Sequence, residues 1–562
     1  MMEWSTACTD WEQRIVARQS LIPFEPLFPD QAAEALEVFG GLRMVDATGS
    51  PLMSETVRSW VNEFVAAIFG AYDPYSGRRM ISEFMLLISK KNGKSTIAAG
   101  IMLTALVLNW RTSGEFIILA PTKEIADNSY IPIRDMVKAD DELKDLFKVQ
   151  DHLRTVTHHQ TGATLKVVAA DSETVSGKKA IGVFIDELWV FGKRANAEAM
   201  LREATGGLAS RPEGFIIWAT TQSDEPPAGV FRQKLLYARQ VRDGGIVDKS
   251  FLSVLYEFPK HMIDAGAHRD VKNAYITNPN LGLSVDEPFI ERGFAQAQID
   301  GEESFRGFLA KHLNVEIGLA LRSDRWAGAE FWEVQAKAPG LTLDDLIERC
   351  EVIDIGIDGG GLDDLLGFAA IGRDKATRQW LLWTHAWAHP SVLERRKGEA
   401  PRLHDFAKEK HLTMVELIGD DLEEVADLAA RVEKAGLLDQ VGVDPAGIGG
   451  VLDALVAAGV PQDKIIGISQ GWKLGGAIKT TERKLAEGGL IHGGQPMMAW
   501  CCGNARVEPR GNSILITKQA SGSAKIDPLM ATFNAVSLMS LNPESKGGMD
   551  DYLKNGFFDL VG

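Results

Sequence analysis

The feature of this sequence that most limits its fold is a series of short apolar runs, each followed by a polar turn and a helical pattern. Between residues 81 and 260 these runs are SEFMLLIS, EFIILAP, ATLKVVAA, IGVFIDEL and GFIIWATTQ. Near-continuous apolar strands separated by helices are typical of a parallel sheet that is buried on both faces. We therefore predict an α/β domain with a mostly parallel sheet over 81–260, preceded by a helical segment over 1–80.

A second series of apolar runs begins at residue 351 and predicts a separate mixed α/β domain over 346–562. Its runs are EVIDIGID, LLGFAAIG, QWLLWTHAWAH, TMVELIG, QVGVDPAG, KIIGIS and SILITK. The stretch 261–345 between the two series is more polar and helical, and we expect it to form a lid or a linker. A chain of 562 residues is long enough for two or three domains.

Composition narrows the class of protein. The hydrophobic content of 45% and the charged content of 24% are typical of a globular chain with sizeable cores. A formal net charge of −17 lowers the expectation of a nucleic-acid partner but does not exclude one, because binding needs only a local basic face. The four cysteines form no C-x-x-C pair and are expected to be free thiols in a reducing cytosol: Cys8, Cys350, Cys501 and Cys502.

The acidic N-terminal residues argue against export, and the length of the longest apolar run argues against membrane insertion. Three acidic residues stand among the first twelve, where a signal peptide would need a basic and then an apolar run. The longest apolar run, 96–110, is shorter than the roughly 20 residues that span a bilayer, so it predicts a buried helix.

The stretch SKKNGKS, residues 89–95, is close to a phosphate-binding loop. Gly93, Lys94 and Ser95 match the end of the G-x-x-x-x-G-K-[ST] pattern, but Ile88 stands where the first glycine would be. An apolar strand precedes the loop and a helix follows from Thr96, which is the context that a phosphate loop needs. The alternative is a basic surface turn.

Two later strand ends support the nucleotide interpretation. The run IGVFIDELW ends in Asp186 and Glu187, which predicts a metal-binding acid followed by a base that activates water. The next run ends in Thr220, Thr221 and Gln222, and polar groups at that position could sense the γ-phosphate. The alternative for the acids is a solvated strand end, but the ordered set of motifs is more specific than any one of them.

Three widely spaced acids in the second series suggest a second site. Asp358 ends one strand, Asp444 ends another, and Asp527 opens a helical stretch; their spacings are 86 and 83 residues. Acids at such positions can hold two Mg²⁺ or Mn²⁺ ions for phosphodiester cleavage, although solvated strand ends remain the alternative. Asp363 and Asp364 are possible further ligands or solvated turn acids, and His492 is either a phosphate or metal contact or a structural histidine.

Taken in order, these motifs resemble the large subunit of tailed-bacteriophage terminases, which are DNA-packaging motors. The resemblance extends over residues 50 to 540 and rests on SKKNGKS (89–95), FIDELW (184–189), ATT (219–221), NPNLG (278–282), IDIGIDGGGLDDLLGF (353–368), VGVDPAGIG (441–449), ISQGWKL (468–474), GGLIHGGQPMMAWCCGN (488–504) and KIDPLMATFNA (525–535). It implies an N-terminal P-loop ATPase of the ASCE type and a C-terminal ribonuclease H-like nuclease.

The resemblance also implies roles for residues of the first site. Glu187 would be the catalytic base, and Lys90 would be a catalytic cation, since the family often carries a basic residue three positions before the glycine. Whether Lys90 or Lys91 faces the nucleotide stays open. The expected set for ATP and Mg²⁺ is Lys90, Gly93, Lys94, Ser95, Thr96, Asp186, Thr220 and Thr221, with Ser95 and Asp186 on the metal.

For the second site, the resemblance makes Asp358, Asp444 and Asp527 the ligands of two Mg²⁺ or Mn²⁺ ions. The implied partners are double-stranded DNA, a small terminase subunit and the portal of the procapsid, with a homo-oligomeric ring on the portal, in the host cytoplasm and without a membrane. Four residues are candidates for a cation supplied to a neighbouring subunit, and none is favoured: Lys178, Lys179, Arg202 and Arg211.

Two other classes of function are weighed against this one. A DNA helicase or remodelling ATPase with a non-catalytic C-terminal DNA-binding domain would have no need of the three strand-end acids. A remnant with inactive sites is disfavoured by the intact Lys94, Glu187 and Asp358.

Overall fold

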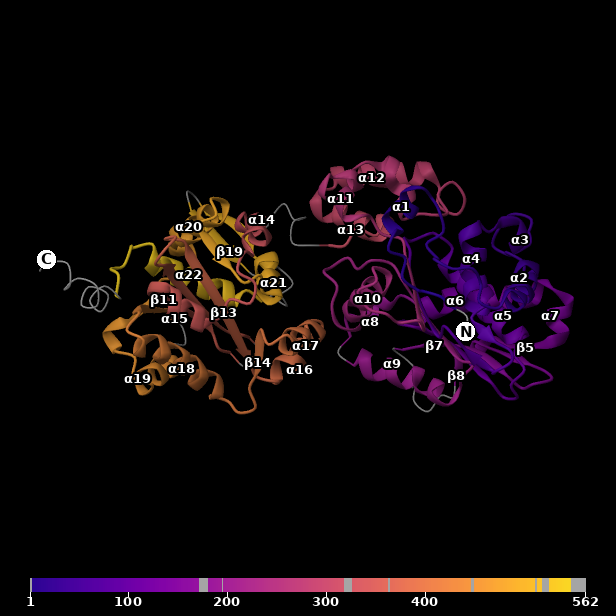
Figure 1. Ribbon diagram of the computed structural model, residues 1–562, viewed down its shortest axis with the longest axis horizontal. Helices are drawn as coiled ribbons and strands as arrows, with labels where there is room; N and C mark the ends of the chain where they lie inside the picture. The colour runs from indigo at the N-terminus through magenta and orange to yellow at the C-terminus, as the bar shows by residue number, and fades with distance from the viewer. Residues whose placement is uncertain are drawn as a thin grey trace, which may run out of the picture. The chain divides into compact units, whose positions relative to one another are not determined.

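The structure is a computed structural model that describes residues 3–170, 180–194, 196–317, 326–361, 364–445, 449–510, 513–517 and 525–546. The chain folds into two compact units, Met1–Ile317 and Gly318–Gly562, and each is described by itself (Figure 1). In the described residues, no helix has the length and apolar character that crossing a membrane requires. All four cysteines are buried free thiols, as the sequence predicted.

The first unit is built on an eight-stranded sheet with the order β10-β3-β9-β8-β4-β7-β6-β5. The strands from β10 to β7 run parallel, and β6 and β5 continue the sheet as an antiparallel edge. The strands are β3 (Glu83–Leu87), β4 (Glu115–Ala120), β5 (Phe147–Gln150), β6 (Thr155–His158), β7 (Thr164–Ala169), β8 (Ala180–Ile185), β9 (Phe215–Thr220) and β10 (Phe251–Leu255). A small hairpin precedes them, β1 (Tyr72–Asp73) and β2 (Arg78–Arg79).

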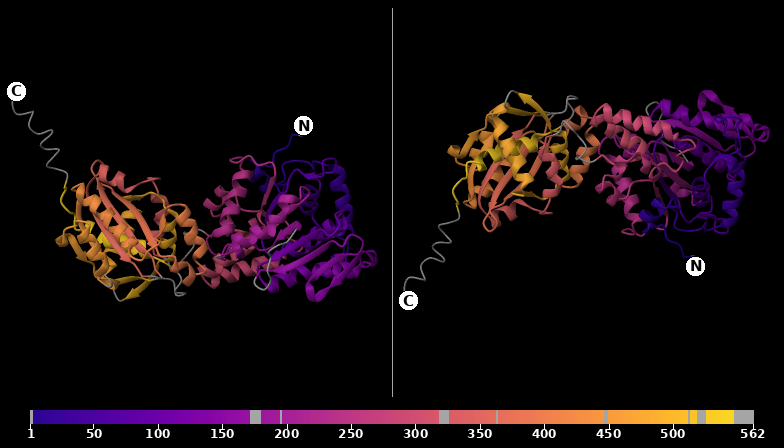
Figure 2. Two further views of the ribbon diagram at one scale, coloured as in Figure 1. Left: turned by 90° about the horizontal axis from the view of Figure 1, so that it is seen from below. Right: turned by 90° about the horizontal axis from the view of Figure 1, so that it is seen from above.

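Helices cover both faces of this sheet, which is why its central strands are apolar throughout. The two buried clusters of side chains lie on opposite faces, one against α5, α6 and the N-terminal helices and the other against α8, α9 and α10 (Figures 1 and 2). The helices of the unit are α1 (Trp11–Val16), α2 (Pro29–Gly41), α3 (Met53–Thr56), α4 (Ser59–Phe69), α5 (Lys94–Val107), α6 (Lys123–Ala139), α7 (Asp141–Leu146), α8 (Leu188–Phe191), α9 (Ala197–Gly206), α10 (Gly229–Arg242), α11 (Lys260–Asp264), α12 (Glu287–Ile299) and α13 (Glu302–Leu313).

The strand order places β9 between β3 and β8. The loop after β3, the polar end of β9 and the acids after β8 therefore meet at one edge of the sheet, because parallel strands have their carboxyl ends on the same side. This strand order is that of an ASCE-type P-loop ATPase, in agreement with the predicted fold class.

The second unit contains a seven-stranded sheet with the order β14-β13-β12-β11-β15-β16, and β17 pairs with β13 beside this path. The strands β11, β12 and β13 are antiparallel, and β15 and β16 run parallel to β11, which is a ribonuclease H-like arrangement. The strands are β11 (Cys350–Gly359), β12 (Leu366–Asp374), β13 (Trp380–Ala388), β14 (Leu412–Met414), β15 (Leu438–Val443), β16 (Ile465–Gly467) and β17 (Leu490–His492), with a separate hairpin of β18 (Arg506–Arg510) and β19 (Ser513–Thr517).

Two apolar clusters also lie on opposite faces of this second sheet. One includes α15, α18 and α19, and the other includes α14, α20, α21 and α22 (Figures 1 and 2). The helices are α14 (Gly328–Trp332), α15 (Leu343–Arg349), α16 (Ser391–Arg395), α17 (Ala400–Lys408), α18 (Asp420–Lys434), α19 (Gly449–Ala457), α20 (Gly475–Ala486), α21 (Pro496–Asn504) and α22 (Asp527–Met539).

The structure differs from the sequence expectations at the edges of its elements. The strands β5, β6 and β10 were not among the predicted runs, since each is a short edge or near-edge segment without a long apolar pattern. The run SILITK forms β19 but pairs only with β18, outside the main sheet. The second unit also starts earlier than residue 346, because Trp326 packs against Phe533 and Trp332 stacks on His492, both inside its core.

A buried acid in this unit generates a prediction about stability. The carboxyl of Asp354 on β11 is fully buried and accepts a hydrogen bond from the backbone N–H of Gln440 at 3.1 Å, where the register between β11 and β15 shifts. Burial, reinforced by the charge of Asp439, raises the pKa of Asp354 to about 8.

We expect Asp354→Asn to flatten the dependence of stability on pH. Between the unfolded pKa near 4 and the folded value, the folded state holds the additional proton, so wild-type stability falls as pH rises, by up to about 1.4 kcal/mol per pH unit. Calorimetry of the full chain between about pH 5 and 8 measures this slope in the transition of the second unit. Asp463→Asn, at an exposed acid, is the control and should keep the wild-type slope.

Candidate active sites

The loop between β3 and α5 has the backbone of an anion-binding turn. Ile88 is fully buried and its N–H donates to the carbonyl of Thr220 at 3.0 Å, so it continues the strand instead of opening the loop. Lys91 and Gly93 have φ angles of 72° and 77°, and α5 begins directly afterwards at Lys94. The N–H groups at the start of this 14-residue helix point to where a phosphate would bind.

Buried asparagines hold this loop in place from a distant part of the sequence. The side chain of Asn92 donates to the carbonyl of Ser89 at 3.0 Å and to the side chain of Asn278 at 2.8 Å. Its oxygen accepts the N–H of Asn280 at 3.1 Å, and the Asn280 amide donates back to the carbonyl of Asn92 at 2.9 Å. Trp60 on α4 donates to Asn280 at 2.8 Å. The motif NPNLG, which entered the sequence analysis only as part of the resemblance, therefore holds the predicted phosphate loop in place.

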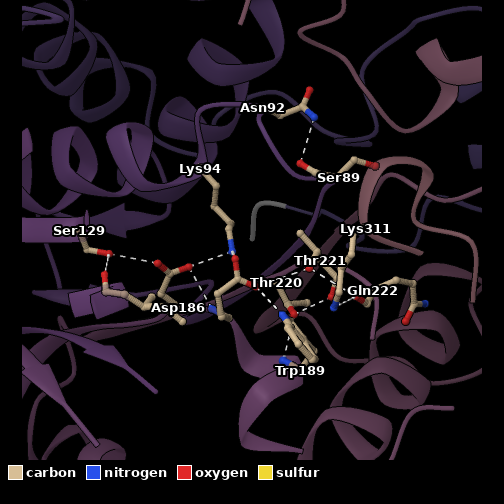
Figure 3. A network of polar contacts seen from close by, with 12 residues as sticks. Ser89, Asn92, Lys94, Ser129, Asp186, Trp189, Thr220, Thr221, Gln222 and Lys311 are labelled. Atoms are coloured by element: carbon tan, nitrogen blue, oxygen red, sulfur yellow. Dashed lines mark hydrogen bonds and ion pairs between the residues drawn. The ribbon is translucent and has the colours of Figure 1, made fainter. Parts of the chain in front are cut away.

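The ammonium of Lys94 lies between the two predicted acids of β8. Its Nζ is 2.9 Å from Asp186 Oδ1 and 2.5 Å from Glu187 Oε1, and Figure 3 shows the side chain pointing into this cluster. Only 9% of the Lys94 side chain is exposed and 1% of that of Asp186. Burial disfavours the charges, but the ion pairs outweigh it, raising the pKa of Lys94 and lowering the pKa of Glu187.

The acids are oriented by further contacts that the sequence did not indicate. Ser129 on α6 donates to Asp186 Oδ2 at 3.1 Å, and the N–H of Glu187 donates to Asp186 Oδ1 at 2.9 Å. Trp189 Nε1 donates to Glu187 Oε2 at 2.6 Å. Glu187 itself has a φ of 52°, a left-handed conformation that is uncommon outside glycine and that turns the chain sharply after the strand.

Thr220, the last residue of β9, and Thr221, which follows it, lie next to this cluster and are fully buried. Thr220 Oγ1 accepts the backbone N–H of Trp189 at 3.1 Å, and Thr221 Oγ1 is 3.5 Å from Glu187 Oε2. The structure therefore brings the predicted threonines together with the predicted base. They contact the turn that carries Glu187.

The remaining residues of the predicted set lie around the loop. Ser95 and Thr96 are half-buried in the first turn of α5. Lys90 and Lys91 are both exposed, and the backbone N–H of Lys90 donates to the carbonyl of Lys311 on α13 at 2.9 Å. Lys178 and Lys179 lie outside the described residues.

These residues fit a nucleotide with its divalent cation. The buried cluster contains two carboxylates and one ammonium, so its net charge is −1, which favours the binding of a cation. Hydroxyl and carboxylate oxygens, as in Ser95 and Asp186, are the donors that Mg²⁺ prefers. The helix N-terminus and Lys94 supply the donors for phosphate oxygens.

In the second unit, the backbone brings the three predicted acids to one place. Ile357 of β11 is paired with Val443 of β15 in the parallel ladder, so Asp358 and Asp444 follow side by side. Asp358 is paired with Gly367 across β12, and a Cβ added at Gly367 would lie 2.6 Å from the carbonyl carbon of Asp527. The start of α22 therefore rests directly on this strand pair.

Glycines make this close approach possible. A Cβ at Gly356 would collide with the carbonyl oxygen of Ala531 on α22, and one at Gly359 would lie 3.3 Å from the Cβ of Asp527. In the described residues, no three His, Cys, Asp or Glu side chains form a ready metal-ligand cluster. The placement of the carboxylates suits oxygen-preferring cations such as Mg²⁺ or Mn²⁺.

The structure assigns other roles to the remaining candidates. Asp364 forms an ion pair of 2.6 Å with Lys525, whose side chain is almost fully buried, so Asp364 is not a solvated turn acid. Asp363 lies outside the described residues. His492 is buried and stacked on Trp332 at 3.8 Å; its Nδ1 accepts the N–H of Gly494, and burial lowers its pKa to about 4. It is a neutral structural histidine, the second of the two interpretations.

Comparisons with known proteins show which family the chain resembles. Residues 59–238 match the family described as the terminase large subunit, ATPase domain, a span that contains Lys94, Asp186 and Thr220. The chain is 22% identical over 509 residues to the terminase large subunit of Enterobacteria phage HK97, covering 86% of this chain and 92% of that relative. The predicted resemblance to terminase large subunits is thereby confirmed.

Two solved structures complete the comparison. The crystal structure of the HK97 bacteriophage large terminase has a TM-score of 0.47 at 19% identity, covering 90% of this chain and 99% of that chain. The structure of a large terminase from a thermophilic bacteriophage, in complex with ADP, has a TM-score of 0.31 at 14% identity, covering 83% of this chain and 96% of that chain.

We expect Asn92→Ala to loosen the phosphate loop. The change leaves the buried N–H of Asn280 without its acceptor, which costs about 1–3 kcal/mol of folding stability. Denaturation of the full chain and the dissociation constant for a fluorescent ATP analogue measure the two consequences, and both should worsen. Asn273→Ala, at a half-buried side chain with one hydrogen bond to Ala267, is the control. Unchanged stability and affinity for Asn92→Ala would contradict the bracing role.

Proposed function

We propose that this chain, with its terminase large-subunit ATPase domain and its ribonuclease H-like second unit, is the motor and nuclease subunit of a phage DNA-packaging machine. In this proposal, ATP hydrolysis drives double-stranded DNA into a procapsid, and the second unit cuts the concatemer at initiation and termination. In this proposal the ATPase core is 81–260, and the part of the predicted lid or linker, 261–345, that belongs to the first unit, 261–317, is its lid. The observation that carries the proposal is the buried cluster of Lys94, Asp186 and Glu187 at the carboxyl edge of the sheet.

The first reaction is the hydrolysis of ATP. The first turn of α5 and Lys94 bind the phosphates, so the ammonium of Lys94 exchanges its ion pairs with the acids for contacts with the nucleotide. Glu187, no longer in that ion pair, accepts a proton from a water molecule as the oxygen of this water attacks the γ-phosphorus. The bond from this phosphorus to the bridging oxygen of ADP breaks, and ADP and phosphate are the products.

Several residues prepare this step. Asp186 and Ser95 would hold Mg²⁺, which neutralises charge on the phosphate oxygens when it is bound. Trp189 orients the carboxylate of Glu187 through its hydrogen bond of 2.6 Å. Lys90, exposed at the loop, is proposed to add positive charge near the γ-phosphate. Thr220 and Thr221 connect the state of Glu187 to β9.

The second reaction is the cleavage of a phosphodiester bond in DNA. Asp358, Asp444 and Asp527 would hold two Mg²⁺ or Mn²⁺ ions, which supply an activated water and stabilise the leaving oxygen. The chain's own contribution is to hold the three carboxylates at one edge, through the register of β11 with β15 and the seat of α22 on glycines.

Further parts of the proposal follow from the terminase resemblance. The partners are double-stranded DNA, a small terminase subunit that recognises the sequence, and the portal of the procapsid, on which the chain acts as a homo-oligomeric ring in the host cytoplasm. The alternative is a helicase or remodelling ATPase with a non-catalytic C-terminal domain. The closeness of two strand-end acids, Asp358 and Asp444, to Asp527 at the start of α22 favours the nuclease.

We expect Glu187→Gln to abolish hydrolysis while leaving nucleotide binding in place. Loss of the general base lowers kcat by about 10²- to 10⁴-fold, whereas the phosphate-binding donors are untouched. Steady-state ATPase assays and nucleotide titrations of the full chain measure the two quantities. Glu203→Gln, at an exposed glutamate of α9, should behave as wild type. Retained hydrolysis in Glu187→Gln would exclude the assigned base.

We expect Asp444→Asn to separate the two activities. Cleavage of supercoiled plasmid with Mn²⁺ or Mg²⁺ should fall by roughly 100-fold or more, since losing a ligand weakens metal binding at least as much as losing a residue that supports one. ATP hydrolysis should stay at the wild-type rate. Asp463→Asn serves again as the exposed control. If cleavage survives the change, or if both activities vanish together, the assignment of two separate sites is wrong.

A further inference from the structure

Lys311 connects the helix α13 with the nucleotide site in two ways. Its carbonyl oxygen accepts the backbone N–H of Lys90 in the phosphate loop at 2.9 Å. Its Nζ donates to the carbonyl of Gln222, directly after the threonines of β9, at 3.0 Å. One residue of the lid region thus contacts both the predicted phosphate loop and the segment that follows β9. Figure 3 shows Lys311 beside Gln222 and Trp189.

The same ammonium lies against the side chain that orients the base. Nζ of Lys311 is 3.0 Å from the centroid of the Trp189 ring, a cation–π contact that fixes the plane of the indole. The indole in turn donates from Nε1 to Glu187 Oε2 at 2.6 Å, and the backbone N–H of Trp189 donates to Thr220. A continuous chain of contacts therefore leads from α13 through Trp189 to Glu187.

The buried surroundings of Lys311 disfavour the charged form of its side chain. The residue is 9% exposed, and the carboxylate of Asp224 is 3.9 Å from its Nζ. Burial lowers the pKa of Lys311 to about 7; Asp224 and Glu187 oppose this, and the charges of Lys90 and Lys193 reinforce it. A lysine kept in such a place adds little to stability, and such groups cluster at functional sites.

A second basic residue nearby provides a contrast. Lys193, which follows α8, has its Nζ 5.1 Å from the centroid of the same Trp189 ring. It pairs with Asp224 at 2.8 Å and with Glu225 at 3.3 Å, and 34% of its side chain is exposed. It is near the indole and shares an acid with Lys311, but its close contacts are with these surface acids and the ring, so it serves as a matched control.

We propose that Lys311 is a positioning residue for ATP hydrolysis: it holds the indole of Trp189, and through it aims the carboxylate of Glu187, so that the catalytic base is aligned only when α13 is seated on the phosphate loop. The proposal rests on the ATPase activity proposed above. It assigns to the lid a direct role in setting the rate of the chemical step, in addition to enclosing the nucleotide. Any movement of α13 away from the loop would withdraw Lys311 and release Glu187.

The test is a double-mutant cycle on the full chain. Lys311→Met removes the charge at similar length, and Trp189→Phe keeps an aromatic ring but removes the N–H donor to Glu187. Each change should lower kcat by roughly 10- to 100-fold, because a small misplacement of a catalytic group costs about that much. The dissociation constant for ATP should change by no more than about twofold, since binding common to ground and transition states is untouched.

The double variant distinguishes a shared route from two separate effects. If Lys311 acts through Trp189, then Lys311→Met should lower kcat little further in the Trp189→Phe background. The kcat of the double variant should then be close to that of the less active single variant. Lys311→Arg, which keeps a cation over the ring, should recover most of the lost kcat. Lys193→Met should be close to wild type.

Three results would overturn the inference: wild-type kcat in Trp189→Phe, multiplicative losses in the double variant, or no recovery in Lys311→Arg while it unfolds at the wild-type temperature. If Lys311→Met does not fold, the kcat values of Trp189→Phe and Lys311→Arg still test the inference. A wild-type chain that does not hydrolyse ATP would instead remove the proposed function, which is a separate outcome.

Discussion

The ammonium of Lys94, buried between the carboxylates of Asp186 and Glu187, is the interaction around which the first unit is organised. Removing such charges from water costs several kcal/mol for each ion, and only close pairing and further hydrogen bonds offset that cost. The structure meets this requirement from three directions: α5 supplies the ammonium, the end of β8 supplies the acids, and Ser129 on α6 donates to the remaining oxygen of Asp186. Because β9 lies between β3 and β8, its threonines are under the cluster.

In the second unit, the close approach of a helix to two strands brings acidic residues near one another. Its acids come from two neighbouring strands and from the first turn of a helix, and the helix approaches the strands where Gly356 and Gly367 leave room for its backbone. A side chain at either glycine would push α22 outward and separate Asp527 from Asp358. The closeness of Asp358 and Asp527 therefore depends on the absence of two Cβ atoms.

Long-range contacts also link the loop after β3 to residues between 278 and 311 of the first unit. Asn278 and Asn280 hold the phosphate loop through the amide of Asn92, and Lys311 contacts the loop, β9 and Trp189. These residues lie nearly 200 positions or more from the loop in the chain. The loop after β3 is therefore joined by buried hydrogen bonds to the turn that precedes α12 and to α13.

The sequence by itself determined the strands that bear the sites, the phosphate loop and the acids at the strand ends. Those features are local: an apolar run sets a buried strand, and a glycine followed by Lys94 sets the loop. It did not reveal Ser129, Lys311 or Lys525, nor the pairing of Asp364, because nothing near them in the chain marks their partners. The strands β5, β6 and β10, at or near the edges of the first sheet, were also missed, since their patterns are short and partly polar. Only the tertiary structure decided the order of the strands and the seat of α22, because these arise from contacts between distant segments that no local pattern encodes.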